Sequence, residues 1–94
     1  MFDKLDSIEE KYEEVTRQLS DPEALADQQK YARTAKQHRE LEEVVAKYRE
    51  YKALDRGIRE TKELLDTEDD AEMLTLARSE LAELEQRRDA VEAE

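Results

Sequence analysis

Apolar residues recur along the first twenty residues at steps of three and four. The positions are Phe2, Leu5, Ile8, Tyr12, Val15 and Leu19. This spacing places them on one face of a helix, and acidic residues cover the opposite face. The pattern predicts a first helix over roughly residues 2–19.

The helical pattern breaks next at "LSDPE", which holds the only proline of the chain. Ser20 or Asp21 can accept a hydrogen bond from a free backbone N–H as the N-cap of a new helix, and Pro22 is tolerated in a first turn. Glu23 stands three residues after Ser20, which is the spacing of a capping box. We therefore expect one helix to end here and a second to begin at Pro22.

A seam of mostly apolar positions continues from there to about residue 66, so we predict a second helix over roughly 22–66. Its positions are Leu25, Gln28, Ala32, Ala35, His38, Leu41, Val45, Tyr48, Tyr51, Leu54, Ile58, Thr61 and Leu65. The mean step of about 3.3 residues is shorter than the 3.5 of a heptad repeat, so the seam rotates around the helix. We expect the first helix to pack on its first half and a third helix on its second half. Gly57 leaves open a kink or break.

The stretch "DTEDDAEML" supplies a cap for a third helix, predicted over about 70–94, because Asp69 and Glu72 are three apart. Its seam holds Leu74, Ala77, Leu81, Leu84, Arg88 and Val91. The expected fold is all-α: an elongated, antiparallel, coiled-coil-like arrangement of three helices with a long central one. The side chains expected to be buried are Leu5, Ile8, Val15, Leu41, Val45, Ile58, Leu74, Leu81 and Leu84.

Composition agrees with an all-α fold and limits the classes of protein to which the chain can belong. Charged residues make up 46% of the 94 residues, and there is one glycine, one proline and no cysteine. A sheet would need more β-branched and turn residues, and a disulfide or thiolate metal site needs cysteine. No apolar run approaches the length of a membrane span, and the N-terminus is too acidic for a targeting peptide. We expect a cytoplasmic chain without membrane contact.

The net charge of −11 is unevenly distributed. Residues 1–29 carry a net charge of −6, residues 30–62 a net charge of +4, and residues 63–94 a net charge of −9. Basic residues of the middle segment wind around the outside of the second helix, and two interpretations remain open. They form either a solvated face that pairs with acids of the flanking helices or a docking surface for an RNA or protein partner. The candidates are Lys30, Arg33, Lys36, Arg39, Arg49, Lys52, Arg56 and Arg59.

The sequence offers no catalytic, cofactor or metal site. His38 is the only histidine, and it has neither a second histidine nor a cysteine to complete a zinc or nucleophile site. The acidic run "DTEDDAE" lacks the glycine and the oxygen spacing of a calcium loop. We expect His38 to be a seam residue and the acidic run to be a helix cap and solvated turn.

The order of the pieces resembles a known family. The stretches "MFDKLDSIEEKYEEVTRQLSDPEALADQQKYARTAKQHRELEEVV", "YREYKALDRGIRETKELLD" and "DAEMLTLARSELAELE" are similar to the N-terminal helical domain of bacterial class-one peptide-chain release factors. The resemblance is stronger to the type that reads UAA and UAG, and it covers essentially the whole chain. Residues 1–94 are then a single helical domain of a longer protein, which agrees with a C-terminus that ends without a helix stop signal.

The resemblance also implies a role. Intact members of the family read the stop codon through a tripeptide and release the peptide through a Gly-Gly-Gln motif, and neither element occurs in this chain. The chain is therefore expected to be no enzyme, and to dock the factor near the stalk base of the large ribosomal subunit. Its partners would be the stalk-base protein and nearby rRNA. At this location the chain could also contact the GTPase release factor. The alternative is a free-standing homodimeric coiled-coil adaptor, and the fragment itself is expected to be a monomer or a weak homodimer.

Overall fold

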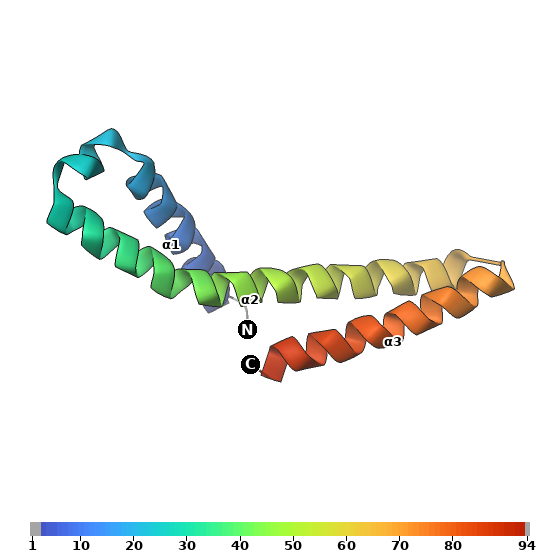
Figure 1. The fold of residues 1–94 in the computed structure, drawn as a ribbon. Coiled ribbons are helices and arrows are strands. Elements are labelled where there is room, and N and C mark those ends of the chain that lie inside the picture. Colours follow the sequence, from blue (N-terminus) through green and yellow to red (C-terminus); the bar gives the residue numbers. More distant parts are fainter. Residues whose placement is uncertain (1–2, 94) are drawn as a thin grey trace. The chain divides into compact units, whose positions relative to one another are not determined.

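The computed structural model describes residues 3–93, which form helices throughout except at the connections (Figure 1). The elements are α1 (Asp3–Ser20), a short 3-10 helix η1 (Pro22–Ala26), α2 (Gln28–Thr67) and α3 (Ala71–Ala93). No strand occurs within residues 3–93, and this confirms the all-α prediction with a long central helix. The predicted first and last helical positions, Phe2 and Glu94, lie outside the described residues.

The chain divides into two compact units, Met1–Tyr48 and Arg49–Glu94, and α2 contributes to both. In the first unit, α1 packs against the first part of α2. The ring of Tyr12 stacks on His38 with 4.6 Å between ring centroids. Thr16 Oγ1 shares a hydrogen bond of 3.0 Å with the Nε2 atom of His38, and Tyr48 donates one to Asp6. Residues early in α1 contact residues late in this part of α2, and residues late in α1 contact earlier ones. The two helices therefore run antiparallel.

The second unit is a hairpin of the same kind, formed by the later part of α2 and by α3. Arg88 lies 3.5 Å from Asp55, and Glu92 accepts a hydrogen bond from Tyr51. Leu54, Ile58 and Thr61 of α2 and Ala77 of α3 form its buried centre. The prediction that the flanking helices pack on different halves of the central helix is therefore confirmed.

Gly57 does not break α2. The helix is continuous from Gln28 to Thr67, and no described residue has a positive φ. A Cβ atom at Gly57 would lie 3.5 Å from Leu84 Cδ1, so this position faces α3 at ordinary packing distance. A kink is not needed here, because the packing of the neighbouring helix offsets the modest helix propensity of glycine.

The start of the second helix differs from the prediction. Pro22 opens the 3-10 helix η1, and α2 begins only at Gln28. The reason is two successive caps: Asp21 Oδ1 accepts a hydrogen bond from the N–H of Glu23, and Asp27 Oδ1 accepts one from the N–H of Lys30, each at 3.0 Å. Asp27 has an extended backbone (φ −116°, ψ 100°), which separates the two helices.

Two details of the predicted break are corrected as a result. Of the two predicted N-caps, Asp21 is confirmed. Ser20 is the last residue of α1 and its hydroxyl donates back to the carbonyl of Thr16, so Ser20 is not a cap and its predicted capping box with Glu23 does not form. The later start of α2 also changes which of its early positions face α1. Leu25, Gln28 and Ala32 are exposed, while Tyr31 and Thr34 are half-buried.

The cap of α3 lies one residue later than predicted. Asp70 Oδ1, not the carboxylate of Asp69, accepts the hydrogen bond from the N–H of Glu72 at 2.9 Å. Glu68 Oε1 accepts from the backbone N–H groups of both Asp69 and Asp70, and this folds the turn so that Asp70 takes the cap position. A capping box between Asp69 and Glu72 therefore does not form.

Fewer of the predicted core side chains are buried than expected. Val15, Val45 and Ile58 are 2% exposed or less, as predicted. Leu5, Ile8, Leu41, Leu74, Leu81 and Leu84 are only half-buried. The reason is that each unit pairs two helices, and no third helix covers the flank of a side chain that lies beside the contact line. Residues 3–93 contain no helix with an apolar stretch sufficient to cross a bilayer.

Candidate interaction surface

All eight basic candidates predicted from sequence lie on α2 and are exposed. They separate by unit. Lys30, Arg33, Lys36 and Arg39 belong to the first unit, and Arg49, Lys52, Arg56 and Arg59 belong to the second. The two groups differ in their surroundings.

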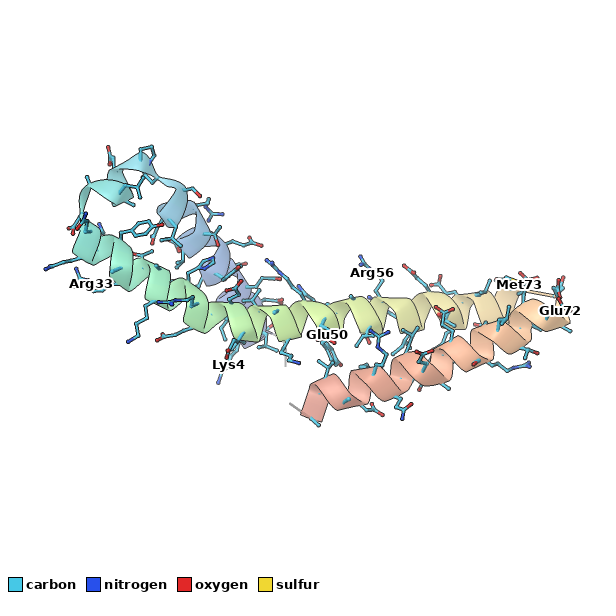
Figure 2. The ribbon with its side chains drawn as sticks, viewed as in Figure 1. Lys4, Arg33, Glu50, Arg56, Glu72 and Met73 are labelled. Carbon is cyan, nitrogen blue, oxygen red and sulfur yellow. The ribbon has the colours of Figure 1, made fainter. Side chains whose placement is uncertain are left out.

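We call the side chains of Lys30, Arg33, Lys36 and Arg39 the cationic surface. Within residues 3–93, none of these four side chains forms an ion pair. The stretch from Gln28 to Arg39 contains no aspartate or glutamate. Figure 2 shows Arg33 on the side of α2 that faces away from α1. These cations are therefore not neutralised by the acids of α1.

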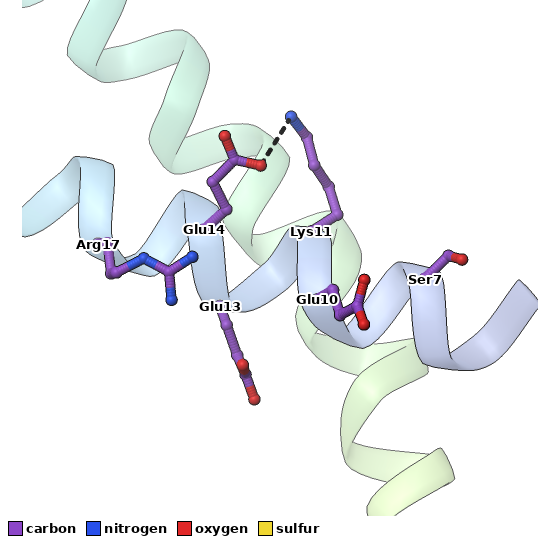
Figure 3. Close-up of a pocket in the computed structure, with 6 residues that line it drawn as sticks. All are labelled: Ser7, Glu10, Lys11, Glu13, Glu14 and Arg17. Carbon is purple, nitrogen blue, oxygen red and sulfur yellow. Dashed lines mark ion pairs between the residues drawn. The ribbon is translucent and has the colours of Figure 1, made fainter.

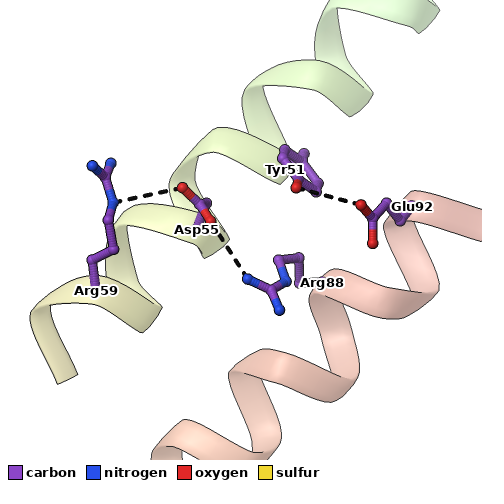
Figure 4. A network of polar contacts seen from close by, with 5 residues as sticks. All are labelled: Tyr51, Asp55, Arg59, Arg88 and Glu92. Carbon is purple, nitrogen blue, oxygen red and sulfur yellow. Dashed lines mark hydrogen bonds and ion pairs between the residues drawn. The ribbon is translucent and has the colours of Figure 1, made fainter. Parts of the chain in front are cut away.

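Three of the four basic side chains of the second unit have partners within the chain, and the exception, Arg56, forms no ion pair within residues 3–93. Arg59 Nε lies 3.6 Å from Asp55 Oδ2 one turn earlier on α2, and the other oxygen of Asp55 lies 3.5 Å from Arg88 (Figure 4). Arg49 and Lys52 also have interaction partners within the chain. Exposed pairs of this kind contribute about 0 to 1 kcal/mol each, so the network orients α3 on α2 more than it stabilises the unit.

The outer face of α1 carries a mixed charge. A shallow, open depression there is lined by Ser7, Glu10, Lys11, Glu13, Glu14 and Arg17 (Figure 3). Lys11 Nζ lies 4.0 Å from Glu14 Oε2. The carboxylates of Glu10, Glu13 and Glu14 are exposed on this helix face.

A groove of about 350 Å³ lies where α1, η1 and α2 meet. It is lined by Gln18, Asp21, Glu23, Ala24, Asp27, Lys30, Tyr31 and Thr34. Its carboxylates at Asp21 and Asp27 already accept hydrogen bonds from backbone N–H groups. Within residues 3–93, no three His, Cys, Asp or Glu side chains group in a way that would hold a metal ion.

Two tyrosines of α2 have raised pKa values, and both donate a hydrogen bond to a neighbouring helix. The hydrogen bond to Asp6, then burial, then the charges of Asp6, Glu9 and Asp3, raise the pKa of Tyr48 to about 12. Burial, followed by the charge of Glu92, raises the pKa of Tyr51. Both hydroxyls therefore stay protonated at neutral pH and act as hydrogen-bond donors between helices.

Sequence reasoning did not single out two exposed apolar side chains near the start of α3. Met73 is 43% exposed and Leu76 is 65% exposed. They lie three residues apart, off the predicted seam. Apolar residues at this spacing share one helix face, and this is the sequence signal that would have identified them. Figure 2 labels Met73 near the turn that joins α2 to α3.

Comparisons with known proteins identify one family and several similar relatives. The PCRF domain family matches residues 8–94. "Peptide chain release factor 1" of Acidobacterium capsulatum is 50% identical over all 94 residues, and that of Carboxydothermus hydrogenoformans is 47% identical over 93 residues. The protein of the same name from Syntrophomonas wolfei is 43% identical over 94 residues.

The chain spans 26% of the length of each of these three relatives. No solved structure matches it. The family match covers far more than half of the chain, and the relatives agree with the resemblance seen in the sequence. The chain therefore belongs to the PCRF-domain family of peptide chain release factors and matches the N-terminal region of bacterial release factor 1.

Proposed function

We propose that this chain is the arm that docks a peptide-chain release factor on the ribosome, near the stalk base of the large subunit. The observation that carries the proposal is the match of residues 8–94 to the PCRF domain, together with relatives named as release factors. The described residues offer exposed, charged helix faces, which suit the recognition of a large partner. A factor that acts on ribosomes works in the cytoplasm, so we place the protein there.

The charge distribution supports two kinds of contact in this docking. The acidic segments 1–29 and 63–94 complement a basic ribosomal protein such as one at the stalk base, and the basic segment 30–62 complements rRNA phosphate. Complementary charge of this kind raises the rate of encounter and fixes orientation. The GTPase release factor is a further partner that this location would bring into reach.

We assign no codon reading or peptide release to this chain. Gly57 is its only glycine, so it cannot supply a Gly-Gly-Gln motif. The one histidine, His38, is half-buried, stacks on Tyr12 and shares a hydrogen bond with Thr16. These contacts account for His38 as part of the packing between α1 and α2.

The test uses the chain and the intact factor side by side. The 94-residue chain is titrated into a termination reaction driven by the intact factor and its GTPase partner, and residues 1–94 are deleted from the intact factor in a second arm. The chain should compete weakly, with micromolar or weaker affinity, because separation from the other domains removes a linkage gain of about 10²-fold or more. The deletion should weaken ribosome binding and recycling. Unchanged binding and recycling after the deletion would contradict the proposal.

A homodimeric adaptor is the alternative, and the exposure of Met73 and Leu76 is the observation that favours it. A dimer that buried these side chains would be weakened by Leu76→Ser. Sedimentation equilibrium separates the two functions: a docking arm stays monomeric at micromolar concentration, whereas an adaptor is dimeric there and loses its dimer on this substitution.

A further inference from the structure

We propose that the cationic surface of Lys30, Arg33, Lys36 and Arg39 binds the phosphate backbone of double-helical RNA. The inference deepens the proposed docking function and rests on it for the biological source of the RNA. Of the eight basic candidates, it assigns the RNA contact to the four in the first unit.

The first argument is that these four cations are available. They are exposed, and within residues 3–93 they form no ion pair. The nearest acids along the chain are Asp27 and Glu40, which bound the stretch at its two ends. Asp27 is engaged as the cap of α2 through the N–H of Lys30. No carboxylate between them would repel a phosphate.

The second argument is that α2 begins with a cation where helices usually carry an acid. The N-terminal end of a helix carries a partial positive charge, so an acid in the first turn stabilises the helix and a cation there destabilises it. Of the four cations, Lys30 lies in the first turn of α2. The first turn of α2 contains no acid, although α1, η1 and α3 each have at least one there. A local departure from a stabilising rule without a compensating ion pair is typical of a functional surface.

The third argument is geometric. Successive members of the cationic surface are three residues apart, so each is displaced by about 4.5 Å along the helix axis and about 60° around it. The four therefore occupy about half of the helix circumference over about 14 Å. Cations on both flanks of one helix can reach phosphates on both sides of a groove, as in the shape-based recognition of double-stranded RNA.

The fourth argument favours RNA over an acidic protein. Protein interfaces draw most of their affinity from buried aromatic or large aliphatic anchors. Between residues 28 and 39, Tyr31 and His38 are half-buried in the packing against α1. The exposed side chains are Gln28, Gln29, Lys30, Ala32, Arg33, Lys36, Gln37 and Arg39. Cations and amides without an apolar anchor suit a phosphate backbone, whose binding is dominated by charge.

The test compares two variants of equal net charge. The first, K30Q/R33Q/K36Q/R39Q, removes the cationic surface. The control, K4Q/R17Q/R78Q/R87Q, removes four other exposed cations from α1 and α3. Circular dichroism verifies that both variants keep their helices.

Binding is measured with a labelled RNA duplex of unrelated sequence at a series of salt concentrations. The unmodified chain should bind with a slope of log K against log salt of about −3.6, which corresponds to four phosphate contacts at about −0.9 each. The first variant should bind about tenfold more weakly or worse and lose most of that slope, and the control should bind within about twofold of the unmodified chain. Equal losses in both variants, or equally tight binding of polyglutamate, would overturn the assignment to RNA phosphate.

A ribosome-pelleting arm separates this inference from the docking proposal. Pelleting that is lost in the first variant and kept in the control supports both. Duplex binding by a chain that does not pellet with ribosomes even at low salt supports the cationic surface and contradicts docking. Pelleting of the unmodified chain without duplex binding contradicts the cationic surface and leaves docking supported.

Discussion

The hydroxyl of Tyr48 donates a hydrogen bond of 2.5 Å to the Asp6 carboxylate across 42 positions of sequence. It joins the first turns of α1 to the middle of α2, and the same bond is the largest cause of the raised pKa of Tyr48. Because the folded pKa of about 12 exceeds the ordinary value of 10.0, the contribution to stability is complete below pH 10. It is lost as the pH rises through 12.

Tyr48→Phe keeps the ring and removes this bond, so it should reduce the pH dependence of stability in that range. The melting temperature of the unmodified chain should fall between pH 10 and pH 12 by more than that of the variant, because only the unmodified chain must ionise this hydroxyl. Circular dichroism melts at several pH values measure the difference. If the difference in melting temperature between the two proteins stayed constant from neutral pH to pH 12, Tyr48 would titrate in the folded chain as it does in the unfolded chain.

Ile58→Ala should destabilise the chain by about 2 to 4 kcal/mol, because the side chain is 2% exposed between α2 and α3. Leu81→Ala should cost less, about 1 to 2 kcal/mol, because Leu81 is only half-buried. Glu83→Ala, an exposed position on α3, is the matched control and should change stability by less than about 0.5 kcal/mol. Urea unfolding gives all three values. Equal costs for Ile58 and Glu83 would show that the core of the second unit is misplaced.

Gly57→Ala should stabilise the chain by about 0.5 to 1 kcal/mol. Alanine is the better helix former by about that amount, and the new Cβ would meet the Leu84 methyl carbons at ordinary distances of 3.5 and 3.9 Å. The shift of the urea midpoint, at unchanged slope, measures the effect. A loss of stability would mean that α2 and α3 approach more closely at this position than these distances indicate.

Periodicity alone was sufficient to locate most of the fold. Positions such as Val15, Val45 and Ile58 were buried as predicted, because a step of three or four residues determines which face of a helix meets its neighbour. The 3-10 helix η1 was not predictable in the same way. Asp21 and Asp27 each cap a separate helical segment, and sequence cannot decide which of several acids next to a proline will do so.

The polar contacts depended on register, which the sequence pattern does not contain. Asp6 lies off the apolar seam of α1, so its pairing with Tyr48 follows only once the two helices are aligned. The exposure of all eight basic candidates did follow from their helical positions. The division between unpaired cations such as Lys36 and paired ones such as Arg59 required the three-dimensional arrangement.

The most direct test of docking is binding of the isolated 94-residue chain to purified 70S ribosomes, measured by pelleting over a range of salt with the intact factor as competitor. The account predicts weak, saturable binding that declines as salt rises and that the intact factor displaces. The K30Q/R33Q/K36Q/R39Q variant should bind less than the control of equal charge. Absence of binding at low salt, or binding that the intact factor does not displace, would contradict the docking function.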